Sequence, residues 1–288
     1  PMDVLQNPYL AIGLNHASLH KVPDPACKGD AVMALLARCP HAGVTPLVDA
    51  KGLAEQLGLA SLHIKDERAR MGLGSFKALG AAHVIARHAQ EGRARGATYM
   101  AASAGNHGLS VAAGAAAFGA KAIIYLSETV PESFAERLRA QGAQVRRAGA
   151  RYEDSMAAAA RDAEAEGAFL LSDSSWPGYF EAPHVLMEGY LALMEEVYDQ
   201  IPHVPDLILL QAGVGGLAGA AAASARVRWG AGPRIVVVEP EAAPALQASI
   251  RAGAPVVTEG PVSAMGRLDC KEPSLIALKG LSRDADLF

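Results

Sequence analysis

Cysteine is scarce in this sequence. The three cysteines, Cys27, Cys39 and Cys270, are odd in number, far apart and in no Cys-x-x-Cys pair. This pattern argues against a disulfide framework and against a structural zinc site. We therefore expect a reducing, cytoplasmic setting for the chain.

Charge, aromatic residues and long apolar runs are scarce as well. Charged residues make up 19% of the chain, aromatic residues 5%, and the formal net charge is −4 with both signs interspersed. No basic face is expected, so neither nucleic acid nor a membrane surface is a predicted partner. Residues 1–6 lack the pattern of a signal peptide. The longest uncharged stretch, 207–225, contains a glutamine and four glycines and predicts a strand, a turn and a helix rather than a membrane span.

Metal ligands in a recognisable spacing are also lacking. His16 and His20 lie one helical turn apart, but no glutamate follows in the spacing of a zinc peptidase. Asp49, Asp66 and Glu67 are expected to be surface or interdomain charges. No metal site is predicted.

Aliphatic residues are abundant, and 51% of the 288 residues are hydrophobic, which is enough for a sizeable core. From about residue 97, short β-rich runs alternate with longer alanine-rich stretches, as in parallel sheets with crossover helices. The predicted strands are 98–102, 122–126, 144–147, 169–171, 207–210 and 235–238. The predicted helices are 106–118, 131–141, 152–166, 183–197 and 217–228. The strands form two groups on either side of 172–205, so we predict an α/β fold of two open parallel-sheet lobes with a cleft between them.

A glycine loop follows the apolar run 207–210. It reads Gly-Val-Gly-Gly-Leu-Ala-Gly over residues 213–219 and leads into a helical stretch. A strand, a glycine turn and a helix N-terminus together form an anion site, because unpaired N–H groups and the helix dipole point at the ligand. Two alternatives remain at this point. The loop also satisfies Gly-x-Gly-x-x-Ala with Glu239 as a ribose-binding acid, and a tight turn without any ligand is the other alternative.

Two further segments carry candidate chemistry. In Gly74-Ser75-Phe76-Lys77 a lysine begins an apolar helical stretch, where desolvation favours the neutral amine that Schiff-base formation requires. A structural lysine at a helix end is the alternative. Residues 103–108, Ser-Ala-Gly-Asn-His-Gly, form a polar turn that offers hydroxyl, amide and backbone N–H groups to a carboxylate or a ring oxygen. A simple helix cap explains this turn too.

The order of these three motifs resembles the pyridoxal-phosphate enzymes of the tryptophan-synthase β-subunit fold (fold type II), in particular their dehydratase and ammonia-lyase branch. Residues 172–179, 187–190, 238–240 and 268–274 narrow the resemblance to the diaminopropionate ammonia-lyases and extend it over nearly the whole chain. The resemblance favours phosphate over a dinucleotide at the glycine loop, because a dehydrogenase has no use for the two upstream motifs.

The resemblance implies that pyridoxal 5′-phosphate is the cofactor and that Lys77 attaches it. The implied cofactor-binding residues are Phe76, Lys77, Asn106, Gly213, Val214, Gly215, Gly216 and Leu217. The implied substrate-binding residues are Ser103, Ala104, Gly105, Asn106 and His107. It also implies a homodimer, with a large cofactor-binding domain of residues 1–80 and 189–288 and a smaller inserted domain of residues 81–188.

The implied reaction is α,β-elimination of a small amino acid, with 2,3-diaminopropionate giving pyruvate and ammonia. Asp173 corresponds to a family carboxylate that acts on the L-substrate, so Lys77 and Asp173 are the expected catalytic pair. A second family aspartate is replaced by Ala104, which predicts a preference for the L-isomer and makes the loop similar to that of threonine or serine dehydratases. In relatives the chain continues beyond the position of Phe288 and supplies the partner of the pyridine nitrogen, which this sequence does not assign.

Three functional classes stay open. The main prediction is the eliminating lyase, either on diaminopropionate or as a threonine or serine dehydratase. The second is a β-replacement synthase, although synthases usually carry Thr-Ser-Gly-Asn-Thr where this chain has Ser-Ala-Gly-Asn-His at 103–107. The third is a protein that binds the cofactor with little turnover.

Overall fold

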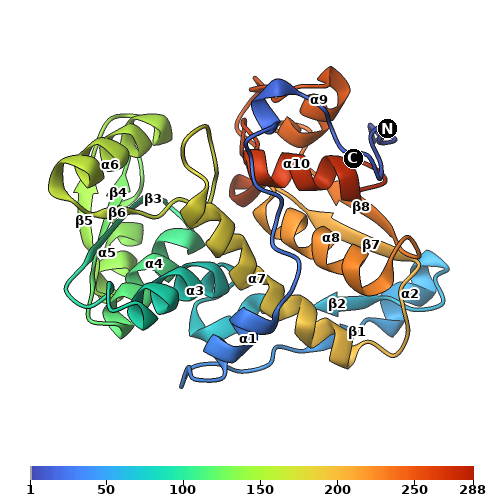
Figure 1. Cartoon of the computed structure of the whole chain (residues 1–288), viewed down its shortest axis with the longest axis horizontal. Helices are drawn as coiled ribbons and strands as arrows, with labels where there is room; N and C mark the ends of the chain where they lie inside the picture. The colour runs from blue at the N-terminus through green and yellow to red at the C-terminus, as the bar shows by residue number, and fades with distance from the viewer. Residues whose placement is uncertain (1) are drawn as a thin grey trace. The chain divides into compact units, whose positions relative to one another are not determined.

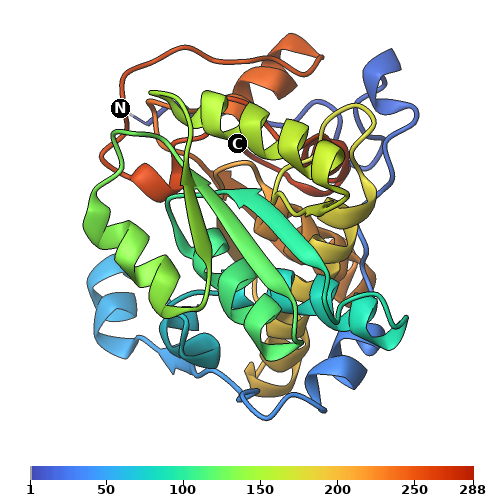
Figure 2. The same cartoon turned by 90° about the vertical axis from the view of Figure 1, so that its left-hand side faces the viewer.

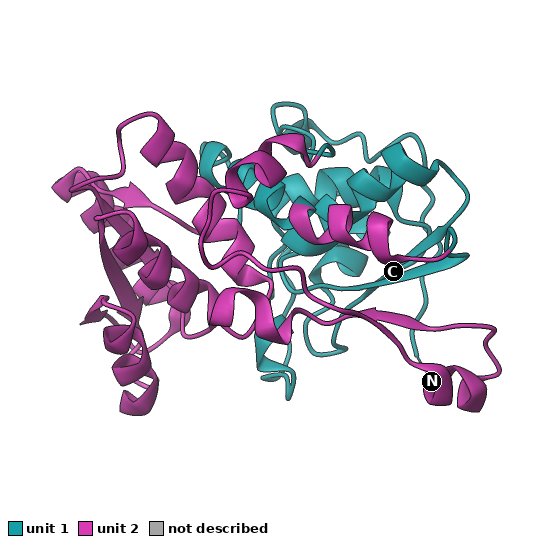
Figure 3. Ribbon diagram, turned by 90° about the horizontal axis from the view of Figure 1, so that it is seen from below, with its two compact units in different colours: residues 1–28, 173–191, 203–288 teal, residues 29–172, 192–202 magenta. Residues whose placement is uncertain are grey.

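The computed structural model describes residues 2–288 and divides the chain into two compact units. Unit 1 comprises residues 1–28, 173–191 and 203–288, and unit 2 comprises residues 29–172 and 192–202 (Figure 3). Helix α7, Glu181–Gln200, contributes residues to both. The predicted division into residues 1–80 with 189–288 and residues 81–188 assigns residues 29–80, 173–188 and 192–202 differently and stays a prediction.

Unit 2 is built on a parallel sheet of four strands in the order β5-β4-β3-β6. The strands are β3, Thr98–Ala102; β4, Lys121–Leu126; β5, Gln144–Arg147; and β6, Phe169–Leu170. They alternate with α4, Asn106–Ala117; α5, Glu132–Ala140; and α6, Tyr152–Glu166. Each connection between parallel neighbours passes through a helix, as parallel pairing requires.

Helices cover both faces of this sheet because its central strands are apolar on both sides. Helix α6 lies along one face, where Ala158 and Ala159 form a buried cluster with Met100 and Tyr125 (Figure 2). On the other face, α4 packs against β4 and against α3, Lys77–Gln90. A Cβ at Gly114 of α4 would lie 3.0 Å from Ile85 Cδ1 of α3, so glycine permits the close approach of these two helices.

The amino-terminal part of unit 2 has a different construction. Helix α1, Asp30–Leu36, is followed by β1, Leu47–Asp49, then α2, Lys51–Leu57, and β2, His63–Lys65. Strands β1 and β2 pair antiparallel. The irregular helix η2, Glu67–Gly72, then leads to α3.

Unit 1 contains the parallel pair β7, Leu207–Gln211, and β8, Arg234–Val238 (Figure 1). Helix α8, Gly216–Trp229, connects the two strands and packs against α10, Leu275–Asp284. Helix α9, Ala245–Ala252, and the short helices η1, Ala17–Leu19, and η3, Gly266–Leu268, complete the unit. The last residues of the chain extend along β8, where Val237 N donates to Leu287 O at 2.9 Å.

The structure confirms the predicted α/β class with open parallel sheets in both halves. All six predicted strands and five predicted helices form, with ends displaced by zero to three residues. The helical stretch expected from Lys77 forms as α3. The sequence did not predict α1, α2, α9 and α10, nor the antiparallel pair β1–β2, whose strands have three residues each. Among residues 2–288, no helix combines the length and apolar character needed to cross a membrane.

Candidate functional site

The predicted site residues lie at the amino ends of three helices. Lys77 is the first residue of α3, Asn106 the first of α4, and Gly216 the first of α8. The first N–H groups of an α-helix have no carbonyl partner within the helix, so a helix start carries donors and a positive dipole end. At α3 and α4 some of these donors bond to serine side chains. The Lys77 and Asn106 segments belong to unit 2, whereas Asp173 and the glycine loop belong to unit 1.

Lys77 is half-buried beside its predicted neighbour Phe76. Its Nζ lies 5.4 Å from the centroid of the Phe76 ring, and its backbone N–H donates to Ser75 Oγ at 3.2 Å. The chain reaches this helix through left-handed positions at Met71, with φ of 51°, and Gly74, with φ of 84°. The turn that precedes α3 is therefore tightly bent, and it places the amine next to an aromatic face.

The Asn106 turn is organised by Ser103. Its Oγ accepts hydrogen bonds from Gly105 N at 3.2 Å and Gly108 N at 3.0 Å, which is the capping role that the sequence left open. A Cβ at Gly108 would lie 2.8 Å from Ser103 O, so this position needs glycine. His107 turns inward: it is buried, and its Nε2 lies 2.8 Å from Leu171 O. Its predicted substrate role stays a prediction, and the ring also ties the turn to residue 171.

The glycine loop is closely surrounded by its own unit. A Cβ at Gly213 would lie 2.9 Å from Cys270 Sγ, and one at Gly215 would lie 3.0 Å from Ala277 Cβ. Gly215 also has φ of 98°, where a side chain is strained. These glycines are therefore required by packing and backbone geometry whether or not a ligand is bound. The turn nevertheless leads directly into the N-terminus of the 14-residue helix α8, so the donors that suit a phosphate are present.

Asp173 lies beside the start of α8. A Cβ at Gly216 would lie 3.9 Å from Asp173 O, so the backbone of the predicted catalytic carboxylate and the glycine loop are neighbours within unit 1. Trp176 and Tyr179, a few residues further on, stack on each other with ring centroids 4.4 Å apart. Their backbones also exchange hydrogen bonds across a tight turn. For these two rings the structure shows mutual packing.

Glu239, the candidate ribose-binding acid, has a different role. Its Oε1 accepts from Leu246 N at 2.8 Å and its Oε2 from Gln247 N at 2.9 Å, so the carboxyl caps α9. Burial raises the pKa of Glu239 to about 7, against the opposing effect of these two hydrogen bonds. Because both oxygens are engaged by the chain itself, the dinucleotide interpretation of the glycine loop loses its acidic partner.

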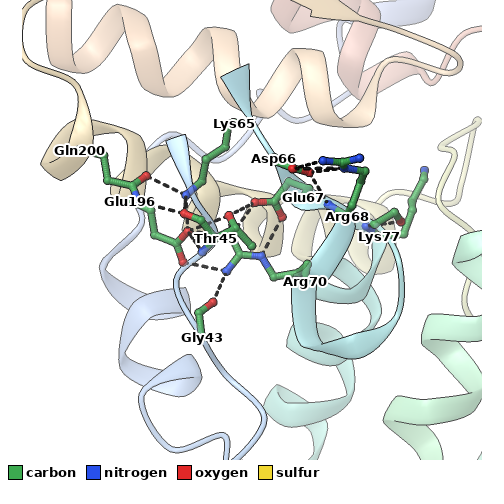
Figure 4. Close-up of polar contacts among 11 residues, drawn as sticks. Gly43, Thr45, Lys65, Asp66, Glu67, Arg68, Arg70, Lys77, Glu196 and Gln200 are labelled. Carbon is green, nitrogen blue, oxygen red and sulfur yellow. Dashed lines mark hydrogen bonds and ion pairs between the residues drawn. The ribbon is translucent and has the colours of Figure 1, made fainter. Parts of the chain in front are cut away.

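Unit 2 contains a buried charge cluster that no sequence motif predicted. Arg70 is fully buried, and its guanidinium donates to Glu67 and Glu196, with Nε–Oε2 and Nη1–Oε1 distances of 2.7 Å (Figure 4). It also donates to Gly43 O at 2.9 Å and Thr45 Oγ1 at 3.0 Å. The expectation that Glu67 is a surface or interdomain charge was wrong: its side chain is 12% exposed and pairs with Arg70.

Lys65 and Gln200 extend the cluster. Lys65 Nζ donates to Glu196 Oε2 at 2.6 Å and to Gln200 Oε1 at 2.9 Å. Burial opposes the charge on Glu196, but the bonds from Arg70 and Lys65 outweigh it and lower its pKa. Two cations and two carboxylates thus neutralise one another out of water. The Lys77 side chain, seven residues after Arg70, points away from this cluster (Figure 4).

Comparison with known proteins agrees with this fold. Residues 39–288 match the family model described as pyridoxal-phosphate dependent enzyme. The chain therefore belongs to this family of pyridoxal-phosphate dependent enzymes. The described residues suit the cofactor chemically, because a lysine beside an aromatic ring and a glycine turn at a helix N-terminus are the groups that an aldehyde and a phosphate require.

Individual relatives cover most of this chain. Diaminopropionate ammonia-lyase of Salmonella typhimurium is 33% identical over 277 residues, which are 86% of this chain and 69% of that protein. L-threonine ammonia-lyase of Thermotoga maritima is 30% identical over 243 residues, 84% of this chain and 57% of that protein. A crystal structure of diaminopropionate ammonia lyase from Escherichia coli in complex with D-serine superposes with a TM-score of 0.88 at 25% identity, covering 99% of this chain and 76% of that chain. In the sequence comparison, this chain spans about half (49%) of the E. coli enzyme.

Removal of Arg70 is expected to destabilise unit 2 strongly. Arg70→Met leaves Glu196 and Glu67 without their main counter-charge, so the free energy of unfolding should fall by about 3–5 kcal/mol. Urea unfolding followed by far-UV circular dichroism measures the change. Arg68→Met is the matched control, because Arg68 is exposed and pairs with Asp66, two residues away. If the free energy of unfolding fell equally in the two variants, the buried cluster would not stabilise unit 2 more than an exposed ion pair does.

Glu239 should make stability depend on pH. The pKa of its carboxyl is about 7 in the folded chain and about 4.5 when unperturbed, so the folded state binds more protons between these values. The free energy of unfolding should therefore fall as the pH rises from about 4.5 to about 7. Glu239→Gln should flatten this part of the curve in urea unfolding at several pH values, whereas Glu241→Gln, at an exposed site, should retain it.

Proposed function

We propose that the chain is a pyridoxal-phosphate-dependent ammonia-lyase that performs α,β-elimination on a small amino acid, with L-2,3-diaminopropionate as substrate and pyruvate and ammonia as products. The observation that carries this proposal is the position of Lys77, beside Phe76 at the first residue of α3, in a chain of this family. The similarity to the Salmonella typhimurium enzyme supports the choice of substrate.

In this proposal each loop holds one part of the cofactor or substrate. Lys77 attaches the cofactor through its Nζ, and Phe76 flanks the ring. Residues 213–217, Gly-Val-Gly-Gly-Leu, receive the phosphate at the N-terminus of α8, where the N–H groups of the first turn are available. Residues 103–107, Ser-Ala-Gly-Asn-His, receive the substrate carboxylate at the N-terminus of α4, and Asn106 also faces the cofactor.

When bound, pyridoxal phosphate supplies an electron sink that allows the α-proton of an amino acid to leave. The chain's own groups must then move protons. We assign Lys77 Nζ and the Asp173 carboxyl to this task, since an amine is a poor leaving group unless an acid protonates it. The position of the Asp173 backbone beside the first turn of α8 supports its assignment.

A threonine or serine dehydratase is the second candidate, and the similarity to L-threonine ammonia-lyase of Thermotoga maritima favours it among the alternatives. We further propose a homodimer in a cytoplasmic setting. The scarcity of cysteine and the lack of a disulfide among the described residues support the reducing compartment.

Lys77→Ala should abolish cofactor attachment. The purified wild-type chain is expected to absorb near the visible edge and to retain a lysine adduct after borohydride reduction, located by peptide mass at Lys77. The variant should lose the adduct and release keto acid only at background level. Lys51→Ala, at an exposed lysine, is the control and should behave as wild type. A wild-type chain without colour or adduct would refute the proposed function.

The chain should prefer L-isomers because residue 104 is alanine. We expect turnover of L-diaminopropionate at least about tenfold above that of the D-isomer, a difference of about 1.4 kcal/mol in activation free energy. Keto-acid release from purified D- and L-diaminopropionate, L-threonine and L-serine measures this preference and separates the two candidate functions. Ala104→Asp should raise activity on the D-isomer, since it adds a carboxylate at an exposed position of the loop. Comparable rates on both isomers in the wild type would contradict the prediction.

A further inference from the structure

Two buried serine hydroxyls meet inside unit 1. Ser175 Oγ and Ser274 Oγ are 2.6 Å apart and share a hydrogen bond. Ser175 is 2% exposed and Ser274 0% exposed, so water does not compete for either group. Burying two hydroxyl groups costs desolvation free energy unless they form hydrogen bonds. These two hydroxyls hold neighbouring segments of unit 1 together.

Ser175 caps helix α10 from outside that helix. Ser274 occupies the N-cap position, but its own side chain makes no capping bond. Instead Ser175 Oγ accepts from Ile276 N at 3.0 Å, and Ser175 O accepts from Leu275 N at 3.2 Å. A residue 99 positions away in the sequence thus satisfies two of the free N–H groups at the start of α10.

Ser274 in turn holds the glycine loop. Its backbone N–H donates to Val214 O at 3.0 Å. The same loop is neighbour to the Asp173 segment, since a Cβ at Gly216 would lie 3.9 Å from Asp173 O. The bonds therefore run from the loop that carries Asp173, through Ser175 and Ser274, to Val214 in the glycine loop.

We propose that Ser175 and Ser274 are positioning residues that fix the Asp173 segment relative to the glycine loop. This inference rests on the proposed function, in which one loop carries a proton-transferring group and the other receives the phosphate. Loss of either hydroxyl removes the bond between the two Oγ atoms, and loss of the Ser175 hydroxyl also removes the bond from Ile276 N, whereas the backbone bond from Leu275 N to Ser175 O remains. The Asp173 segment is then held less firmly at the start of α10, which displaces the carboxyl from the group it serves. A misplacement of about 1 Å is enough to reduce a rate by about 10²-fold.

The test compares Ser175→Ala, Ser274→Ala and the double variant with Ser249→Ala. Ser249 is a matched control in the same unit: it is 0% exposed, and its Oγ donates to Ala245 O at 2.7 Å and accepts from Val256 N at 3.1 Å. Each substitution removes one buried hydroxyl with its bonds, so losses in global stability should be similar. Only the first three variants remove the hydrogen bond between Ser175 and Ser274.

The first readout is hydrogen exchange of the purified chain over residues 172–176 and 213–217. Exchange in both segments should rise about tenfold in Ser175→Ala and in Ser274→Ala, while Ser249→Ala leaves both unchanged. The double variant should resemble Ser175→Ala, since that substitution already removes both the bond between the hydroxyls and the bond from Ile276 N. Faster exchange confined to the start of α10, or equal changes in Ser249→Ala, would refute the coupling and show a plain helix cap.

The second readout separates positioning from stability in the holoenzyme. The pH profile of kcat should shift in the two serine variants, with KM nearly unchanged, because the proton-transferring group moves while the binding loops remain. An unaltered pH profile with a lower Tm would overturn the positioning role. If the wild-type chain binds no cofactor, the proposed function fails, and the exchange data alone decide whether the hydroxyl pair couples the two loops.

Discussion

The buried guanidinium of Arg70 is the interaction on which the first part of unit 2 depends. It joins the loop at Gly43 and Thr45, the short helix η2 and the last turns of α7 through bonds to both carboxylates and to a carbonyl. Strands β1 and β2 have three residues each and cannot form a stable sheet alone. The buried charge cluster, which has no net charge, holds these short strands in place. Burying its charges costs desolvation free energy, and this cost is offset only because every charge is paired.

This restraint acts close to the candidate site. Arg70 lies in η2, and the chain then passes through Met71 and Gly74 in left-handed conformations before Lys77 begins α3. Fixing Arg70 therefore fixes one end of a short, strongly bent connection whose other end is the proposed cofactor lysine. The sequence places this support within seven residues of the proposed cofactor lysine, whose side chain points away from the cluster (Figure 4).

Much of the fold could be predicted from local pattern. Strand β3 and helix α6 have the predicted bounds because alternation of β-rich and alanine-rich runs depends on neighbouring residues alone. The three motifs predicted for the site lie at the starts of helices α3, α4 and α8, because a glycine turn before a helix is a local signal, and their functional roles stay predictions. Arg70 with Glu196, and Ser175 with Ser274, escaped because these partners are 126 and 99 residues apart and their side chains carry no periodic pattern.

The composition of α8 has a consequence for the entropy of the glycine loop. Residues 218–225 consist of alanine, glycine and one serine, and all of them are buried. Alanine and glycine lose no rotamer freedom when they are buried, so this helix becomes ordered at the cost of backbone entropy almost alone. The loop that precedes it is thus anchored to a segment with hardly any alternative side-chain arrangements. The conformation of the glycine loop therefore depends mainly on the backbone, and side-chain rotamers of residues 218–225 contribute almost nothing to it.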